Sequence, residues 1–294
     1  MNIAVLGAGL MGRPMAERLK AAGHAVAVYN RTIEKVLALR QAGVDIHERP
    51  EEAIRAASCV ILMLADAKAI RAVLLSSTVR QELKGRTVVQ MGTIGPKESQ
   101  AIGKLVLDAG GDYLEAPVLG SIAEVQTGKL LVMVGGTPEQ FANWADLFRC
   151  FGPEPRLIGP VGQAAALKLA LNQLIAAEIA AFSLSLGLVL REGIPVDTFM
   201  AILKQSALFA PTFEKKLPRL LKRDYAKPNF STRHLLKDVE LFLKEATTAG
   251  LNTSSLEGVR PLLTKTIERG MADEDYSALF ETVNPASKIR MQGS

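Results

Sequence analysis

The residues with the clearest potential for chemistry lie at 161–173, VGQAAALKLALNQ, where Lys168 stands in a run of alanine and leucine. Asn172 follows four residues later, so on a helix the two side chains would share one face. A helix that is apolar on nearly all sides is usually buried, and burying an unpaired ammonium costs several kcal/mol. Lys168 is therefore either paired for structural reasons or retained for chemistry.

A glycine motif lies near the N-terminus, between a predicted buried strand at 2–6 and a predicted helix at 14–22. Its spacing is G-x-G-x-x-G, in the strand-turn-helix setting that binds the pyrophosphate of a dinucleotide. Gly7 permits the tight turn, Gly9 lets the backbone approach the pyrophosphate, and Gly12 lets the helix pack closely on the strand. The helix N-terminus adds free N–H groups and a positive dipole end. The candidate cofactor-binding residues of this loop are Gly7, Gly9, Leu10, Met11 and Gly12.

The end of the second predicted strand, 25–29, bears on the choice of cofactor. Folds that bind NAD usually carry Asp or Glu at this point for the ribose hydroxyls. This chain has Asn30-Arg31-Thr32, and a guanidinium can bind a 2′-phosphate that a carboxylate would repel. The pattern favours NADP(H) over NAD(H). The alternative is that Arg31 is a surface arginine that precedes a helix.

The elements that must position these residues can be read from hydrophobic periodicity. Further strands are predicted at 60–64, 87–91, 113–115, 130–134 and 155–158, with helices at 67–75 and 97–109. Repeated βα units predict a doubly wound sheet with ligands at the carboxyl ends of its strands. After Gly162 only helical patterns remain, at 163–191, 195–207, 211–223, 231–249, 255–269 and 274–281.

We therefore predict a Rossmann-type α/β domain followed by an all-α domain, joined by a long interdomain helix. The expected boundaries are 1–161 for the NADP-binding domain, 162–191 for the helix, 192–287 for the helical domain and 288–294 for a flexible tail. The helical half has large apolar faces, so we expect a homodimer or homotetramer formed through residues 163–290.

Composition sets the broad class of the protein. The chain has 294 residues, of which 48% are hydrophobic and 22% charged, with a formal net charge of +5. These values are typical of a globular protein large enough for two domains. The basic residues are dispersed, so the modest positive charge favours small anionic molecules and does not indicate nucleic-acid binding.

The cysteines, the histidines and the long apolar helix indicate neither a membrane protein nor a metalloprotein. Cys59 and Cys150 are too few for a disulfide framework, and no secretory signal is recognisable, so we expect a cytoplasmic location. The long apolar helix could suggest a membrane span, but Lys168, Asn172 and Glu178 interrupt it. No metal-ligand cluster is apparent. We interpret the three histidines as structural or surface residues: His24, His47 and His234.

Four motifs follow one another along the chain: GAGLMGRPMA at 7–16, EAPVLGS at 115–121, GQAAALKLALN at 162–172 and LLKDVELFLKEA at 235–246. In this order they resemble the motifs of the β-hydroxyacid dehydrogenase family, which is related to 3-hydroxyisobutyrate dehydrogenase. The resemblance covers nearly the whole chain. It is closest to the glyoxylate/succinic semialdehyde reductase branch, because of Asn30-Arg31-Thr32 and Ser121.

The resemblance implies roles for individual residues. Lys168 corresponds to the catalytic general acid/base, and Asn172 to an asparagine that helps to hold the substrate carboxylate. The implied substrate-binding residues are Gly120, Ser121, Thr93, Asp238 and Phe230. The implied further cofactor-binding residues are Leu64, Ala65, Asp66, Thr93 and Lys237. Without the resemblance, the Lys237-Asp238 pair would be interpreted as a solvated charge pair on a helix.

Two departures from the family pattern bear on the substrate. Leu119 stands where the family usually has serine, so one hydroxyl for the substrate carboxylate is missing. Gln173 stands where many members have a second asparagine. Both are compatible with the implied chemistry, and both bear on which acid is the substrate.

The implied reaction is reversible NADPH-dependent reduction of a small semialdehyde or 2-keto acid, of the succinic semialdehyde or glyoxylate type, to the hydroxy acid. Lys168 as an ammonium would donate a hydrogen bond to the carbonyl oxygen and supply a proton as the alkoxide develops. Three alternatives stay open: a 3-hydroxyisobutyrate-type dehydrogenase working in the oxidative direction, an imine reductase on the same fold, and a non-catalytic NADP-binding protein. The chain is short for the helical domain of a 6-phosphogluconate dehydrogenase.

Overall fold

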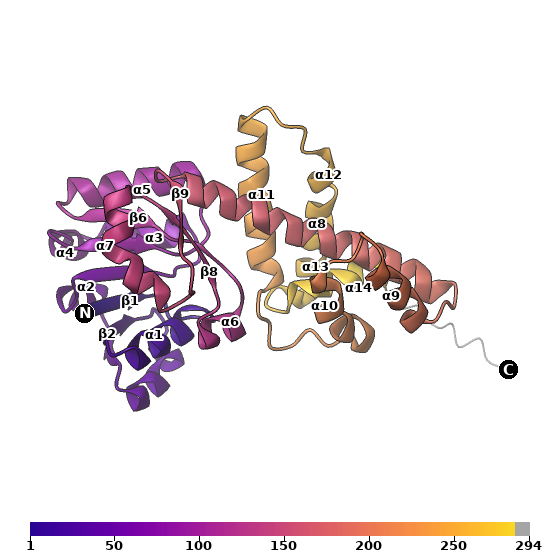
Figure 1. The fold of residues 1–294 in the computed structure, drawn as a ribbon, viewed down its shortest axis with the longest axis horizontal. Helices are drawn as coiled ribbons and strands as arrows, with labels where there is room; N and C mark the ends of the chain where they lie inside the picture. The colour runs from indigo at the N-terminus through magenta and orange to yellow at the C-terminus, as the bar shows by residue number, and fades with distance from the viewer. Residues whose placement is uncertain (286–294) are drawn as a thin grey trace. The chain divides into compact units, whose positions relative to one another are not determined.

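A computed structural model describes residues 1–285 of the chain (Figure 1). The chain forms two compact units, the first at Met1–Ala170 and the second beginning at Leu171. The division therefore falls inside the long helix rather than at one of its ends. The tail predicted at 288–294 lies outside the described residues, as do the last two positions of the predicted helical domain.

The first unit is built on a mainly parallel sheet. Its strands are β1 (Asn2–Leu6), β2 (Ala25–Tyr29), β3 (Asp45–His47), β4 (Cys59–Leu62), β5 (Thr87–Gln90), β6 (Asp112–Glu115), β7 (Val118–Leu119), β8 (Leu131–Gly135) and β9 (Arg156–Gly159). Their order is β3-β2-β1-β4-β5-β6-β8-β7, with β9 paired to β8. Strands β1 to β6 pair in parallel, whereas β8 is antiparallel to both β6 and β7. The expected Rossmann-type fold is confirmed.

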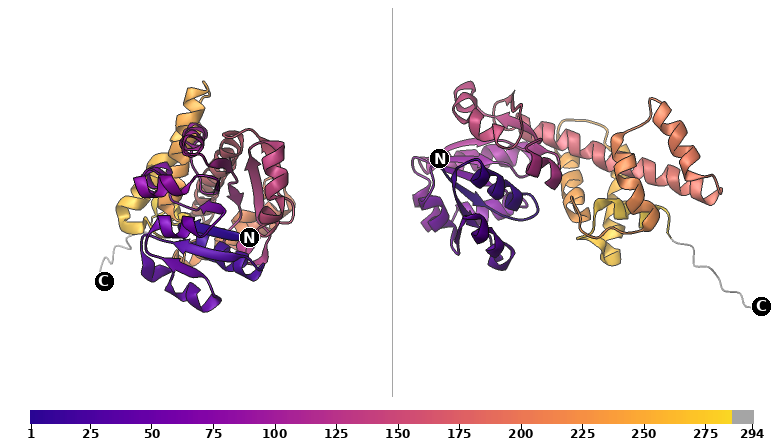
Figure 2. Two further views of the ribbon diagram at one scale, coloured as in Figure 1. Left: turned by 90° about the vertical axis from the view of Figure 1, so that its left-hand side faces the viewer. Right: turned by 60° about the horizontal axis from the view of Figure 1, so that its bottom comes forward.

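Helices cover both faces of this sheet, as the views in Figure 2 show. They are α1 (Gly12–Ala21), α2 (Pro50–Arg55), α3 (Ala67–Leu74), α4 (Ser77–Glu82), α5 (Pro96–Asp108), α6 (Ile122–Thr127) and α7 (Pro138–Arg149). In β1, Ile3 and Val5 enter one hydrophobic core, while Ala4 and Leu6 enter the other. This alternation follows because successive side chains of a strand point to opposite faces.

The sequence patterns do not predict several elements, namely the short β3, β7, α2, α4 and α6 and the 12-residue α7. Strands β3 and β7 have three and two residues, which is too short for a periodic pattern. Helix α7 does carry a readable signal, because Thr137 caps it and Gln140 completes a capping box.

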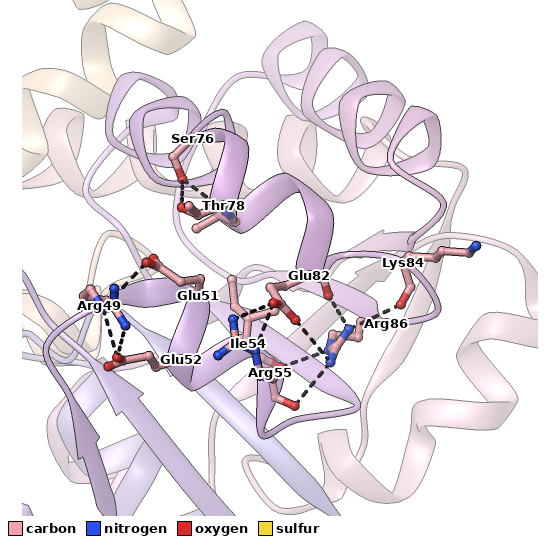
Figure 3. Close-up of polar contacts among 11 residues, drawn as sticks. Arg49, Glu51, Glu52, Ile54, Arg55, Ser76, Thr78, Glu82, Lys84 and Arg86 are labelled. Atoms are coloured by element: carbon pink, nitrogen blue, oxygen red, sulfur yellow. Dashed lines mark hydrogen bonds and ion pairs between the residues drawn. The ribbon is translucent and has the colours of Figure 1, made fainter.

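Helices α2 and α4 lie side by side at the surface, where polar contacts join them (Figure 3). Arg55 donates to Glu82 at 2.7 and 3.0 Å. Arg86 donates to the carbonyl oxygens of Ile54 and Ala57, each at 2.9 Å. Arg86 thus adds a side-chain donor at and just beyond the end of α2, where the Ile54 carbonyl also accepts from the Ala57 N–H at 3.0 Å. The Arg55 side chain is 61% exposed, so its ion pair contributes little to stability.

The second unit is helical, which confirms the all-α domain. Helix α8 (Gln163–Arg191) begins in the first unit and has the predicted bounds. The other helices are α9 (Val196–Gln205), α10 (Pro211–Lys222), α11 (Thr232–Thr248), α12 (Ser254–Glu257), α13 (Val259–Thr266) and α14 (Phe280–Val283). The single helix predicted at 255–269 is wrong in its extent: α12 ends at Glu257 and α13 begins at Val259, while Gly258 between them keeps helical dihedrals. The chain then forms a π-helical turn in which Gly270 has a φ of 87°.

Helix α8 supplies one face to the core of the second unit. Ala176, Ile179 and Phe182 are buried there, and Phe182 stacks on Phe213 with ring centroids 4.6 Å apart. By contrast, Leu184 and Leu188, which lie one turn apart, are 68% and 61% exposed, so this helix is buried on one side only. By length and composition α8 could cross a membrane, with 39% of its apolar window buried, but core helices of globular domains have the same properties.

A buried ion pair fastens α10 to the segment that precedes α14. Lys216 Nζ lies 2.8 and 2.7 Å from the two carboxylate oxygens of Asp275, and both residues are buried. The ammonium also lies 4.2 Å from the centre of the Tyr276 ring. Burial lowers the pKa of Lys216, and the Asp275 charge opposes that change. Breaking such a pair on one side is strongly destabilising because the remaining charge stays buried.

Candidate functional site

The glycine loop after β1 has the geometry that a pyrophosphate requires. Gly7 has a φ of 95°, and a Cβ there would lie 2.4 Å from the Met63 carbonyl oxygen. A Cβ on Gly12 would lie 2.0 Å from the Gly7 carbonyl oxygen. A Cβ at Gly9, however, would meet no atom of the described residues within 4 Å. Gly7 and Gly12 therefore form the loop, while Gly9 leaves open space beside the backbone that fits a dinucleotide phosphate.

Asn30 links this loop to the end of β2. Its Oδ1 accepts from the Ala8 N–H at 3.2 Å, and its Nδ2 donates to the Thr32 carbonyl at 2.7 Å. Arg31, between these residues, is exposed. The amide thus fixes the backbone on both sides of a guanidinium that stands at the carboxyl end of the strand.

The loops after β4 and β5 lie at the same edge of the sheet, because β1, β4 and β5 are neighbouring parallel strands. Asp66 caps α3, since its Oδ1 accepts from the Ala69 N–H at 2.7 Å. Thr93 is half-buried after β5, next to Gly92, whose backbone is held by the Gln90 side chain at 2.7 and 2.9 Å. Leu64 and Ala65 precede Asp66. The predicted cofactor residues of this unit are therefore brought to one edge.

The Gly120-Ser121 turn connects β7 to α6. Gly120 has a φ of 137°, and a Cβ there would lie 2.6 Å from Leu130. The Ser121 N–H donates to Glu124 Oε2 at 2.6 Å, and the Ser121 hydroxyl donates to the same oxygen. The hydroxyl expected to meet a substrate carboxylate is thus engaged with Glu124.

Glu115 is a residue of this region that sequence reasoning missed, although it begins the motif at 115–121. It is 1% exposed at the end of β6, and its Oε1 accepts from the N–H groups of Gly162 and Ala165 at 2.8 and 3.0 Å. Its other oxygen accepts from Ser99. Burial raises the pKa of Glu115, while these hydrogen bonds oppose the change. The carboxylate fixes the N-terminal turn of α8, one turn before Lys168.

Lys168 and Asn172 lie one turn apart on α8, as the spacing predicts, and are 8% and 3% exposed. Asn172 Nδ2 donates to Asp238 Oδ2 at 2.6 Å, and the other oxygen of Asp238 lies 2.9 Å from Lys237 Nζ. Asp238 is 2% exposed, so the alternative of a solvated pair does not describe it. Asn172 Oδ1 is buried with no hydrogen-bond partner among the described residues. Such an oxygen costs about 1–3 kcal/mol unless a ligand supplies a donor.

An aromatic group in the second unit lies near Lys237 and Asp238. The Phe230 ring stacks on His234 at 6.4 Å and meets Tyr276 edge-on at 5.9 Å. His234 Nδ1 lies 2.7 Å from the Ser231 hydroxyl. Burial lowers the pKa of His234, and the Lys237 charge lowers it further, so the imidazole is neutral near pH 7. No group of described residues has the three or more ligands that would hold a metal ion.

Comparison with known proteins adds family information to this geometry. Residues 2–159 match the family model of the NAD binding domain of 6-phosphogluconate dehydrogenase. Residues 162–283 match the model described as NAD-binding of NADP-dependent 3-hydroxyisobutyrate dehydrogenase.

Individual proteins are similar over almost the full length. Glyoxylate/succinic semialdehyde reductase 1 of Arabidopsis thaliana is 30% identical over 96% of this chain and 98% of the relative. 2-Hydroxy-3-oxopropionate reductase of Escherichia coli K12 is 30% identical over 96% and 97%. The structure of Mycobacterium tuberculosis 3-hydroxyisobutyrate dehydrogenase with L-serine is 23% identical, with a TM-score of 0.85 over 96% and 98% of the two chains. This last likeness shows the fold.

Proposed function

Because the chain belongs to the β-hydroxyacid dehydrogenase family and is an NAD(P)-dependent oxidoreductase, we propose that it reduces a small semialdehyde or 2-keto acid with NADPH. The substrate class is that of succinic semialdehyde and glyoxylate, and the product is the hydroxy acid in a reversible reaction. The two reductases that are 30% identical over nearly their full length support this class.

The observation that carries the proposal is the buried pair on α8. Lys168 supplies the only cation of the helix between Gln163 and Leu190, and Asn172 stands one turn further on with an unsatisfied oxygen. Bound NADPH supplies the hydride. The Lys168 ammonium donates a hydrogen bond to the carbonyl oxygen and gives up a proton as that oxygen becomes an alkoxide. Asn172, oriented by Asp238, holds the substrate beside the ammonium.

The remaining substrate contacts are proposed residue by residue. We propose that the backbone around Gly120 and Ser121 receives the substrate carboxylate, with Thr93, Phe230 and Asp238 as further contacts. The Ser121 hydroxyl must then rotate away from Glu124, which leaves Glu124 the Ser121 N–H as a donor. Leu119 offers no hydroxyl at the position before this turn.

The preference for NADP(H) over NAD(H) rests on Arg31. Its guanidinium is exposed and follows β2. The loop around it is held by the hydrogen bond from Asn30 Nδ2 to the Thr32 carbonyl. A guanidinium can bind a 2′-phosphate with two parallel hydrogen bonds. Lys237 is the proposed contact to the cofactor from α11. We assign the pyrophosphate to the loop at 7–12, where Gly9 leaves the backbone accessible.

We also propose that the enzyme is a homodimer or homotetramer formed through the helical half. Leu184 and Leu188, one turn apart on α8, are 68% and 61% exposed, and Ile202 on α9 is 67% exposed; large apolar side chains exposed in this way favour an interface. Analytical ultracentrifugation at micromolar concentration tests this, and a monomer would contradict it. The two described cysteines are free, which agrees with a reducing compartment such as the cytoplasm.

A substrate panel tests the proposed function. Semialdehydes and keto acids of two to five carbons should be assayed with NADPH and NADH, beside a cyclic imine, by following NADPH absorbance. We expect turnover of short carboxylate-bearing aldehydes that collapses in Lys168→Ala, while NADPH binding measured by fluorescence persists. Tight NADPH binding without turnover of any carbonyl would refute the proposal, and preferential reduction of the imine would replace it.

A further inference from the structure

We propose that His234 determines substrate specificity in this same site, by donating a hydrogen bond from Nε2 to a carboxylate or hydroxyl of the substrate. The inference rests on the proposed function, because it assumes that Phe230 and Asp238 contact the substrate. It replaces the interpretation of His234 as a structural or surface residue.

The position of His234 on α11 places it beside residues that are assigned to the substrate or the cofactor. His234 precedes Lys237 and Asp238 by three and four residues, so the three side chains share one face of the helix. Phe230 precedes His234 by another four residues and stacks on its ring. The imidazole therefore stands between the aromatic ring and the carboxylate that are assigned to the substrate.

The orientation of the ring is fixed from two sides. Ser231 is 3% exposed, and its hydroxyl has no other hydrogen-bond partner among the described residues than His234 Nδ1 at 2.7 Å. A buried hydroxyl donates when it has an acceptor, so Nδ1 accepts and the proton of the neutral ring is on Nε2. The Phe230 ring lies nearly parallel to the imidazole, with centroids 6.4 Å apart, and meets Tyr276 edge-on.

Nε2 of His234 is the donor that stays available for a ligand. Nε2 makes no hydrogen bond to the described residues, and it is not among the buried polar atoms that lack a partner, so it is accessible. The charged groups around the imidazole are Lys237, Asp238, Arg233 and Asp273, of which two are cations and two are anions. With the ring neutral, an N–H at this place selects an acceptor, and a carboxylate oxygen is the strongest acceptor in the proposed substrate class.

Specificity follows because a site built to hydrogen-bond a polar group discriminates against a substrate that lacks it. We expect His234→Leu to lower kcat/KM for succinic semialdehyde by about tenfold or more, because a hydrogen bond to a charged group is lost. Butanal has the same carbon chain without the carboxylate, and its kcat/KM should change by less than about twofold. His234→Gln, whose amide N–H can reach the position of Nε2, should restore much of the loss.

The experiment measures kcat/KM for both aldehydes in wild type, His234→Leu and His234→Gln, with NADPH affinity measured by fluorescence in each. His24→Leu is the matched control, because His24 lies before β2 and contacts the N-terminal amine. A selective loss for succinic semialdehyde that Gln rescues supports the inference. An equal loss for both aldehydes, or no loss, overturns it and leaves the proposed function standing. A wild-type enzyme that reduces neither succinic semialdehyde nor any other carbonyl compound of the substrate panel overturns the proposed function, and the inference with it.

Discussion

Replacing Glu115 should separate the structural support of α8 from the chemistry that we propose for Lys168. In Glu115→Ala, the buried N–H groups of Gly162 and Ala165 lose their acceptor. Each unsatisfied buried donor costs about 1–3 kcal/mol, so the free energy of unfolding should fall by about 2–6 kcal/mol. Glu115→Gln keeps an amide oxygen for both donors and should cost about 1 kcal/mol or less.

Activity should follow the same order, because the N-terminal turn of α8 sets the position of Lys168 one turn later. A displacement of a catalytic group by about 1 Å can lower turnover about 100-fold. We therefore expect Glu115→Ala to lower kcat by about 10- to 100-fold, with NADPH affinity nearly unchanged, and Glu115→Gln to stay close to wild type.

Urea unfolding followed by circular dichroism measures the free energy of unfolding of each variant. Steady-state kinetics measures kcat, and NADPH fluorescence measures the affinity for NADPH, so that an effect on turnover can be distinguished from an effect on binding. Glu82→Ala is the matched control: Glu82 pairs with Arg55 at the surface and should change neither quantity much (Figure 3). Equal stability of Glu115→Ala and Glu115→Gln would refute the assigned role of the carboxylate. So would a loss of NADPH affinity as large as the loss of kcat.

Three further outcomes are expected. Burial raises the pKa of Glu115 above 4.5, so the folded state binds the carboxyl proton more tightly than the unfolded state does. The free energy of unfolding of wild type should therefore rise relative to that of Glu115→Gln as the pH falls toward 4.5. Unfolding measured at several pH values tests this, and a constant difference between the two proteins would contradict it. Arg31→Asp should lower the ratio of kcat/KM for NADPH over NADH by about tenfold or more, and an unchanged ratio would remove the argument for NADP(H). Gly12→Ala should cost about 1–3 kcal/mol because its Cβ would collide with the Gly7 carbonyl, whereas Gly258→Ala, with ordinary helical dihedrals and no atom closer than 3.6 Å, should be neutral in the same melting assay.

The parts of the site that sequence could predict are those fixed by local spacing. The glycine loop follows from a strand, three glycines and a helix within a short segment. Lys168 and Asn172 share a face of α8 because the helical repeat places them one turn apart. The strands at 2–6 and 25–29 have the predicted bounds because alternate residues enter two separate cores.

The parts that sequence could not predict depend on contacts between distant segments. Glu115 reaches Gly162 and Ala165 from 47 and 50 residues away, and nothing in its neighbours indicates that partner. Asp238 looks solvated on a polar helix until Asn172, 66 residues earlier, is placed against it. Burial of charge is decided by such tertiary contacts and not by local composition.

The two hydrogen bonds of Asn30 constrain how the cofactor choice of this enzyme could change. An aspartate at this position would keep an acceptor for the Ala8 N–H, but it would set a second anionic oxygen against the Thr32 carbonyl, where the amide now donates. The usual acidic residue for ribose hydroxyls therefore cannot simply be installed here. Changing the proposed preference for NADP(H) therefore requires either a substitution at Arg31 or two coordinated substitutions, which are an acidic residue at position 30 and a new clamp for the loop.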